Sequence, residues 1–377
     1  MSFKKKIAFV CSTRISLEHD DRIRKVCLSL STLYNVNVFV LFSDNREETG
    51  TTSYGIPYKS ISLKSRKYLS SGKLLFVKAY EFYKRFKKSL KDYNLVWVVD
   101  EYAFVFPLLY KKRPIIWELH EIPQHFISRN IMKRVFWYIE KRCSYIIHAN
   151  KERLDYLVDK GVVRQANKHS YIHNYPQESV IVPSYSSESI QRVKDWCKNQ
   201  PYVYCQGLNM LDRFPYNSVK TLIDTTNYKI VVVGGFHKEA KIILEKEYGK
   251  ILSERVFFTG AIPSIDIPYI IKDAKFSIVL YESSHPNRMY CEATRLFYAL
   301  RLGVPVVVGN NETMRNTVEQ YQCGVVANTD GRDLSELKNA ITKLLDNYEE
   351  YKQNTVKNKD KFVWENDKVL EVASKAF

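Results

Sequence analysis

The sequence has little of what marks secreted, zinc-binding or membrane-spanning proteins. Its seven cysteines are scattered and form no C-x-x-C pair, which argues against a disulfide framework or a zinc ribbon and agrees with a cytosolic protein. No apolar run approaches the roughly 18 to 20 residues that span a bilayer, so any membrane contact is expected to be peripheral. The first apolar run is short and is interrupted at Ser12, so it predicts a strand and not a signal peptide.

Several ligand-binding motifs are also missing. The sequence has no P-loop, no dinucleotide G-x-G-x-x-G, no Asp-x-Asp element after a strand and no metal-ligand spacing among its eight histidines. We therefore expect no metal and no cofactor. Internal repeats and low-complexity tracts are absent as well, which excludes a solenoid.

Acidic residues are in deficit in only one half of the chain. The 377 residues carry 58 basic and 41 acidic side chains, a net charge of +17. Residues 1–200 hold 35 basic against 19 acidic side chains, whereas residues 201–377 hold 23 against 22. This asymmetry favours an anionic partner for the first half, either a membrane surface or a nucleic acid. Because 45% of the chain is hydrophobic and 14% aromatic, a disordered basic tail is excluded.

Short β-branched runs alternate with longer helical patterns throughout, which is typical of βαβ units and parallel sheets. We expect strands at Lys6–Cys11, Val36–Phe42, Asn94–Val99, Pro114–Leu119, Tyr145–Ala149, Tyr202–Cys205, Lys229–Val233, Arg255–Phe258, Phe276–Tyr281, Val304–Val308 and Gly324–Ala327. The sequence predicts two doubly wound, Rossmann-like α/β domains, residues 1–180 and residues 181–365, with a C-terminal helix 366–377 that crosses back to the first domain. Ligands bind such sheets beyond the carboxyl ends of the strands, so we expect the active site in a cleft between the domains.

The second half carries an ordered series of landmarks. Strand Tyr202–Cys205 runs into Gln206-Gly207 and then Arg213; next come a valine-rich strand ending in Gly234-Gly235 and the segment RLFYALRLGVP from Arg295 to Pro305. In the first half, the corresponding landmarks are Trp117-Glu-Leu-His120-Glu121, Tyr171-Ile-His173-Asn174-Tyr-Pro176 and, near the end of the chain, Phe362-Val-Trp364-Glu365. Together their order resembles the retaining glycosyltransferases of the GT-B fold, specifically family 4 (group 1).

This resemblance implies transfer of a sugar from a nucleotide-diphosphate donor to a glycan acceptor, with retention of configuration. We expect the acceptor to be lipid-linked and the pathway to be bacterial surface polysaccharide synthesis. The enzyme class is then EC 2.4, and the partners are the nucleotide sugar, the acceptor and an anionic membrane surface. The alternatives are a silent relative that binds a glycan or a partner enzyme, and a sugar-nucleotide epimerase.

The resemblance also implies roles for individual residues. Arg213 occupies the place of a phosphate-binding lysine, although Asp212 before it offers the plainer reading of a surface ion pair. Arg295, before the helix that leads to the G-x-P turn, is expected either at the donor or at the solvent. His120 is expected at the donor sugar or its phosphate, with Glu121 orienting its imidazole. The remaining donor-site candidates are strand-end glycines, which let a ligand approach the backbone closely or simply serve turns: Gly207, Gly234 and Gly235.

Three positions depart from the family pattern. The two glutamates of the usual signature are replaced by Tyr290 and Tyr298, and the first of the usual basic pair is Leu208. A tyrosine cannot accept two hydrogen bonds from a ribose diol as a carboxylate does. We expect Glu292 to be the substitute ligand. The same departures motivate the alternative of a catalytically silent relative.

The first domain contains three basic clusters, within residues 59–67, 73–91 and 111–113. Residues 73–91 read KLLFVKAYEFYKRFKKSLK, in which Leu75, Phe82, Phe86 and Leu90 recur at helical spacing. The ordinary reading is a packing helix with a solvated basic face; the functional one is docking to an anionic membrane. No known nucleic-acid-binding module is recognisable, so nucleic acid is not expected as a partner. The localisation expected is cytoplasmic, on the inner face of the cell membrane, with these cations on the membrane or acceptor side: Lys84, Arg85, Lys87, Lys88, Lys111 and Lys112.

Overall fold

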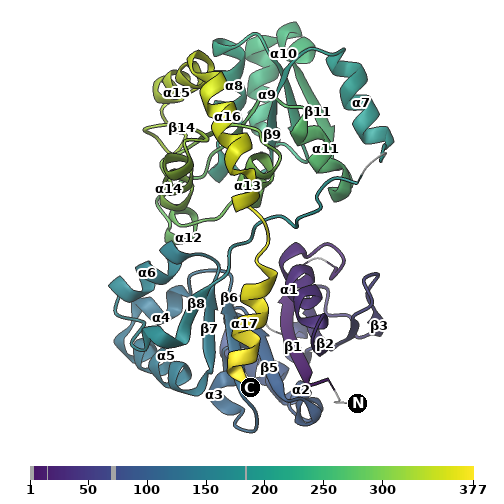
Figure 1. The fold of residues 1–377 in the computed structure, drawn as a ribbon, viewed down its shortest axis with the longest axis vertical. Coiled ribbons are helices and arrows are strands. Elements are labelled where there is room, and N and C mark those ends of the chain that lie inside the picture. Colours follow the sequence, from purple (N-terminus) through teal and green to yellow (C-terminus); the bar gives the residue numbers. More distant parts are fainter. Residues whose placement is uncertain (1–3, 15, 69–73, 183–184) are drawn as a thin grey trace. The chain divides into compact units, whose positions relative to one another are not determined.

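The computed structural model describes residues 4–14, 16–68, 74–182 and 185–377. The chain forms two compact units, residues 1–174 together with 365–377 and residues 175–364, shown in Figure 1. Both are α/β, as the sequence predicts. The first unit ends before the expected boundary at residue 180 because Tyr175 already packs against Phe297 and Phe362 of the second unit. Lys73, the first residue of the basic segment 73–91, lies outside the described residues.

Unit 1 is built on an eight-stranded sheet of order β3-β4-β2-β1-β5-β6-β7-β8. Within the described part of this unit, the pairing of β3 with β4 is the only antiparallel one. Strands β5 and β6 are buried along their whole length, as expected for strands with helices on both faces. The strands are β1 (Lys6–Thr13), β2 (Asn35–Phe42), β3 (Thr49–Thr51), β4 (Pro57–Ser60), β5 (Leu95–Val99), β6 (Ile115–Leu119), β7 (Tyr145–His148) and β8 (His169–Tyr171).

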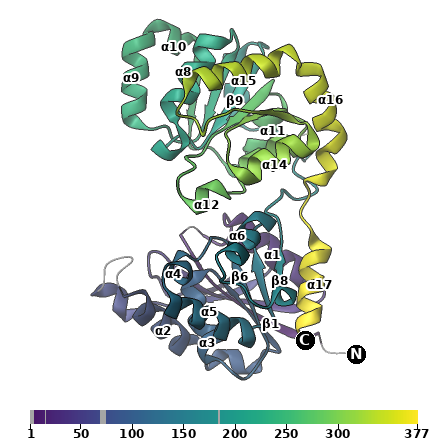
Figure 2. The same cartoon turned by 90° about the vertical axis from the view of Figure 1, so that its left-hand side faces the viewer.

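The C-terminal helix belongs to unit 1. Helix α17 lies beside α1 (Figure 2), where Ser29 Oγ donates to Asn366 Oδ1 at 2.7 Å and the rings of Tyr34 and Phe377 lie 5.2 Å apart. The chain therefore returns to its first unit, as predicted. The helices of this unit are α1 (Asp21–Ser31), α2 (Leu75–Phe86), α3 (Val105–Leu109), α4 (Gln124–Ser128), α5 (Asn130–Arg142), α6 (Lys151–Asp159) and α17 (Asn366–Ala376).

Unit 2 is built on a fully parallel six-stranded sheet of order β11-β10-β9-β12-β13-β14. Successive residues of β9 point to opposite faces of the sheet. Tyr202 and Tyr204 join one hydrophobic core, and Val203 and Cys205 join the other. The strands are β9 (Tyr202–Gln206), β10 (Lys229–Val233), β11 (Val256–Gly260), β12 (Phe276–Val279), β13 (Val306–Val308) and β14 (Gly324–Val326).

The helices of unit 2 cover both faces of its sheet. Helices α8, α9, α10 and α15 contribute to one core, and α7, α11, α13 and α14 to the other. The helices are α7 (Glu188–Cys197), α8 (Pro215–Thr225), α9 (Lys238–Tyr248), α10 (Lys250–Arg255), α11 (Ile267–Lys272), α12 (Pro286–Met289), α13 (Thr294–Arg301), α14 (Glu312–Tyr321), α15 (Leu334–Asp346) and α16 (Tyr348–Asn358). Among the described residues, no helix is long and apolar enough to cross a membrane.

Each sheet has a point at which the strand order reverses direction. In unit 2 the chain runs outward from β9 in one direction and from β12 in the other, and in unit 1 the same holds for β1 and β5. Open α/β sheets bind ligands beyond the carboxyl ends of the strands at such a point. The loops that follow these four strands are therefore the places to look for a site.

Candidate functional site

Two arginines meet at Gly207, directly after β9. Gly207 has a φ of +71°, and Arg213, at the end of the following 3-10 helix, donates from Nη1 to the Gly207 carbonyl at 2.9 Å. Arg295, the second residue of α13, donates from Nη1 to the carbonyl of Gln206 and from Nη2 to that of Leu280 at 3.1 Å. A Cβ added to Gly207 would lie 2.4 Å from Arg213 Nη1 and 2.7 Å from Arg295 Nη1. Only glycine leaves room for both guanidinium groups.

The two guanidinium groups are held without a carboxylate. Both lie over the ring of Tyr281, Arg213 at 5.3 Å and Arg295 at 4.7 Å from its centroid. Among the described residues, neither arginine forms an ion pair, and the buried Nε atom of each has no hydrogen-bond partner. Arg295 is 7% exposed. Two uncompensated cations at the reversal point of the sheet form a receptor for an anion with several oxygens, such as a diphosphate.

The carboxylates nearest in sequence are held by other arginines. Asp212 Oδ2 pairs with Arg288 Nε at 3.0 Å, so the expected alternative in which Asp212 neutralises Arg213 is wrong. Glu282 pairs with Arg288 and Arg332, each at 2.8 Å. Hydrogen bonds from Ser284 and these two ion pairs lower the pKa of Glu282 to about 2. Both carboxylates therefore fix the loop after β12 and leave the arginine pair positively charged.

The remaining donor-site candidates lie in loops around this pair. Gly234, at the end of β10, has a φ of +87° and donates its N–H to the Gly260 carbonyl at 3.0 Å. A Cβ on Gly235 would lie 3.4 Å from Cβ of Asn209, which places the β10 end beside the loop after Gly207. Glu292 is half-buried between α12 and α13. Its role as a ribose or sugar ligand stays a prediction.

The two tyrosines in place of the usual glutamates differ in their surroundings. Tyr298 lies on α13 and packs against one core of unit 2, so it has become part of the packing. Tyr290 ends α12 and is half-buried.

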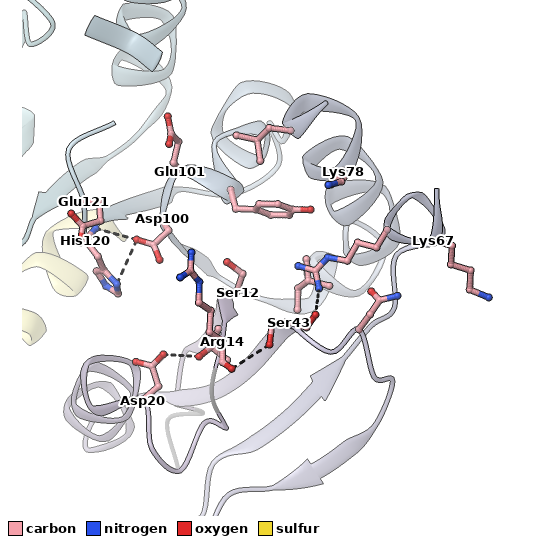
Figure 3. A pocket seen from close by; sticks show the side chains of 16 residues that line it. Ser12, Arg14, Asp20, Ser43, Lys67, Lys78, Asp100, Glu101, His120 and Glu121 are labelled. Atoms are coloured by element: carbon pink, nitrogen blue, oxygen red, sulfur yellow. Dashed lines mark hydrogen bonds and ion pairs between the residues drawn. The ribbon is translucent and has the colours of Figure 1, made fainter. Parts of the chain in front are cut away.

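In unit 1, His120 follows β6 and is held by two carboxylates. Its Nε2 lies 3.1 Å from Glu118 Oε1 and its Nδ1 lies 3.5 Å from Asp100 Oδ1, which also accepts the His120 backbone N–H at 3.2 Å. Figure 3 shows the contacts with Asp100. Burial disfavours the imidazolium, but the two carboxylates outweigh it and raise the pKa of His120 to about 9. His120 is therefore cationic at neutral pH and donates hydrogen bonds.

The expected role of Glu121 in orienting the imidazole falls to Glu118 and Asp100. Glu121 is exposed, and its Oε2 lies 3.1 Å from Arg153 Nη2. Sequence reasoning missed both orienting residues, although each carries a signal. Glu118 stands two positions before His120 and so points to the same side of the strand. Asp100 directly follows the predicted strand Asn94–Val99, at a strand end of the kind where ligands bind; its φ of +66° is seen only in the structure.

Glu118 is itself the centre of a buried network. It is fully buried, and its oxygens accept hydrogen bonds from Arg22 Nε and Trp97 Nε1, both at 2.7 Å. Burial would raise the pKa of this carboxyl, but Arg22 and His120 lower it to about 2. The imidazole is thus anchored to a carboxylate that stays ionised throughout the physiological range.

A pocket of about 1020 Å³ opens beside His120, within unit 1 (Figure 3). Loops after β1, β2, β5 and β6 line it, and so does the start of α2. Both signs of charge face this space, as the labelled side chains of Figure 3 show. The charged residues lining it are Arg14, Asp20, Arg66, Lys67, Lys78, Asp100, Glu101, His120 and Glu121.

The predicted basic clusters lie along α2 and after α3. The segments that follow these two helices are adjacent, because Tyr110 Oη donates to the Leu90 carbonyl at 3.0 Å and Arg113 Nη2 donates to that of Lys91 at 3.4 Å. Arg85 pairs with Glu47 at 2.9 Å. The other cations predicted for this side are exposed: Lys84, Lys87, Lys88, Lys111 and Lys112.

The two Rossmann-like units define the GT-B class of fold, and comparison with solved structures agrees. Sucrose-phosphate synthase from Thermosynechococcus elongatus superposes with a TM-score of 0.73 at 16% identity, covering 98% of both chains. HepE of Anabaena in complex with UDP gives 0.72 at 15%, again over 98% of both chains. An E. coli protein described as trehalose-6-phosphate bound with UDP-2-fluoro glucose gives 0.68 at 13%, covering 98% of this chain and 99% of that one.

Residues 212–362 match the sequence family described as glycosyl transferases group 1. No curated protein matches the sequence. The matched segment begins beside Arg213 and spans most of unit 2, including Arg295. The family match together with the fold supports a transferase of the EC 2.4 class, as the sequence predicts.

Proposed function

We propose that this glycosyltransferase moves a sugar from a nucleoside diphosphate donor to a lipid-linked glycan acceptor, with retention of configuration, in bacterial surface polysaccharide synthesis. The observation that carries the donor assignment is the convergence of Arg213 and Arg295 on Gly207. On this proposal the protein belongs with the retaining enzymes of family 4.

The proposed chemistry follows from the fixed positions of the two cations. When the bond between the sugar and the diphosphate breaks, negative charge develops on the leaving phosphate oxygens. Carbonyl groups already hold both guanidinium groups in place, so little reorganisation is needed as this charge forms. Arginine forks can each hold two phosphate oxygens. The arginine pair supplies the countercharge, and we expect no metal ion to be needed.

His120 supplies a cationic hydrogen-bond donor in this proposal. With a pKa of about 9 it is protonated at neutral pH, so it suits a hydroxyl or phosphate oxygen of the donor and does not suit proton abstraction. Glu118 and Asp100 position it.

A uridine diphosphate sugar is the first donor to test. Anabaena HepE has been solved with UDP and with UDP-glucose, and a third structure of the same fold holds UDP-2-fluoro glucose. Because these proteins share only the fold with this chain, the base and the sugar are proposals.

The acceptor side is proposed for unit 1, where the positive charge of the chain is concentrated. The pocket beside His120 accommodates a polar head group, and the exposed cations along α2 suit an anionic membrane surface. We propose that the protein is peripheral on the cytoplasmic face of the membrane.

A second candidate function is a catalytically silent relative that binds a glycan or a partner enzyme. It is favoured by Tyr298, which packs against a core of unit 2 and stands where the family pattern has a ligand-binding carboxylate.

Thermal unfolding with UDP, GDP, TDP and CMP tests the donor assignment. One of these nucleotides is expected to stabilise the wild-type protein, and Arg213→Ala should lose that stabilisation while Arg192→Ala, an exposed arginine of α7, keeps it. Sugar transfer from the matching nucleotide sugar then separates the two candidates, because a silent relative binds the nucleotide without turnover. Full transfer activity in Arg213→Ala would refute the phosphate role.

A further inference from the structure

The first two turns of α2 present an apolar edge to the solvent. It consists of Leu74, Phe76, Val77 and Tyr80, whose exposed fractions are 61, 54, 45 and 44%. Phe82 and Phe86, on the predicted packing face of this helix, are buried. The apolar edge is therefore a second, largely exposed hydrophobic stripe; its Phe76 ring also lies 6.0 Å from that of the buried Phe104. Contiguous exposed apolar residues of this kind mark a site of interaction.

The same outward face becomes cationic toward the end of the helix. Counting from Tyr80, steps of three or four residues lead to Lys84 and then to Lys87 and Lys88, all exposed. Residues 64–91 contain ten basic side chains and one acidic side chain. That acidic residue, Glu81, accepts hydrogen bonds from the backbone N–H groups of residues 64 and 65 at 2.7 and 2.9 Å, so it sits against the basic 3-10 helix Lys64–Lys67.

An apolar edge flanked by cations fits an anionic lipid surface better than a protein. Apolar side chains at the start of the helix enter the boundary between head groups and acyl chains, and lysines reach the phosphates. A second copy of this chain would bring two strongly basic faces together, which like-charge repulsion opposes. Nucleic acid would satisfy the lysines and leave the aliphatic side chains in water.

We infer that the apolar edge of α2 inserts into an anionic phospholipid bilayer and that Lys84, Lys87 and Lys88 bind its head groups. The edge borders the pocket beside His120, because Leu75 and Lys78 of the same helix line that pocket. An acceptor can then place its polar head in the pocket while its lipid tail stays in the membrane. This last step rests on the proposed function and names the substrate class as a membrane lipid.

Vesicle flotation at low and high salt tests the inference, with vesicles of phosphatidylcholine alone or mixed with phosphatidylglycerol. The edge variant combines Phe76→Ser, Val77→Ser and Tyr80→Ser. A matched control removes three apolar side chains of unit 2 that are 63, 51 and 49% exposed, namely Ile242→Ser, Ile243→Ser and Ile251→Ser. A third variant combines Lys84→Gln, Lys87→Gln and Lys88→Gln.

The wild-type protein should float with the mixed vesicles and keep part of that binding at high salt, because insertion is not screened. The edge variant should lose about tenfold or more of its partitioning and become fully salt-sensitive, whereas the control should match the wild type. The lysine variant should lose its preference for phosphatidylglycerol. Circular dichroism checks that each variant is folded; single changes at Val77 and Tyr80 replace the triple variant should it unfold.

Two results would overturn the inference. Unchanged flotation of the edge variant would show binding through charge alone, and dimerisation without flotation would assign the edge to a second copy. Nucleotide stabilisation of unit 2 is measured separately in the same variants. A protein that floats without binding any nucleotide would refute the proposed donor site and leave the membrane inference standing. A protein that binds a nucleotide without floating would refute the membrane inference and leave the donor site standing.

Discussion

Replacing Gly207 with alanine should disable the donor site while leaving the protein folded. The added Cβ would lie 2.4 Å from Nη1 of Arg213 and 2.7 Å from Nη1 of Arg295. Ordinary contact begins at 3.4 Å, so the two guanidinium groups must withdraw by about 1.0 and 0.7 Å. Since both are ends of flexible side chains, they can move away, but each then leaves the carbonyl that holds it.

The expected magnitudes separate stability from binding. A left-handed alanine costs about 1–2 kcal/mol of folding free energy. Moving the guanidinium groups by about 1 Å also weakens the hydrogen bonds that they would donate to the diphosphate. Each such charge-assisted bond contributes about 1.5–3 kcal/mol. Loss of one such bond corresponds to a fall in nucleotide affinity of about 10- to 150-fold.

Gly260→Ala is the matched control, because Gly260 has a φ of +70° and open space where its Cβ would be. Both variants should lose stability in urea unfolding, Gly207→Ala the more, because it also moves two arginines off their carbonyl groups. In calorimetric titration with the stabilising nucleoside diphosphate, only Gly207→Ala should lose affinity. Equal affinity in the two variants would refute the assignment of the arginine pair to the diphosphate.

Three further predictions concern unit 1. Glu118→Gln should lower the free energy of unfolding by about 3–5 kcal/mol, because Arg22 is left buried without its countercharge; urea unfolding measures this, and a loss below about 1 kcal/mol, the range of a surface pair, would contradict it. In the same variant the pKa of His120 should fall below its wild-type value of about 9, as followed by NMR titration; an unchanged pKa would assign the shift elsewhere. Burial lowers the pKa values of His148 and His169, so their contribution to stability is present above pH 6.5, the ordinary value, and is lost as the pH falls below it. In His169→Phe the free energy of unfolding should therefore fall less steeply as the pH is lowered below 6.5. An identical slope in the variant and the wild type would be inconsistent with this.

Much of the fold follows from the sequence because strand and helix periods are strongly expressed. Every expected strand has a counterpart that overlaps it in the structure. The strands that escaped prediction are β3, β4 and β8, which have only three or four residues and too little alternation to register as a pattern. The two units and the returning helix α17 follow from the ordered landmarks.

The site is only partly predictable, because its contacts cross long stretches of chain. Strand-end position identified Arg213 and His120 as candidates. The sequence did not show that Arg295 reaches the same glycine as Arg213, since that meeting depends on β9 and β12 being neighbours. The strand period would have preferred Glu118 to Glu121 as the partner of His120.

The apolar edge of α2 shows a different limit. Helical spacing reveals that a helix has apolar stripes, but it does not say which stripe the sheet covers. Phe82 is buried and Phe76 is 54% exposed, although both lie on the same helix. In the structure Phe82 is surrounded by the rings of Phe86, Tyr102 and Phe106, whereas Phe76 contacts the ring of Phe104.

A crystal structure with the nucleoside diphosphate that stabilises the protein most tests the central claim most directly. We predict that the diphosphate oxygens lie within hydrogen-bond distance of the guanidinium groups of both Arg213 and Arg295, next to Gly207. A diphosphate bound away from this pair, with the two arginines still on their carbonyl groups and facing solvent, would contradict the account.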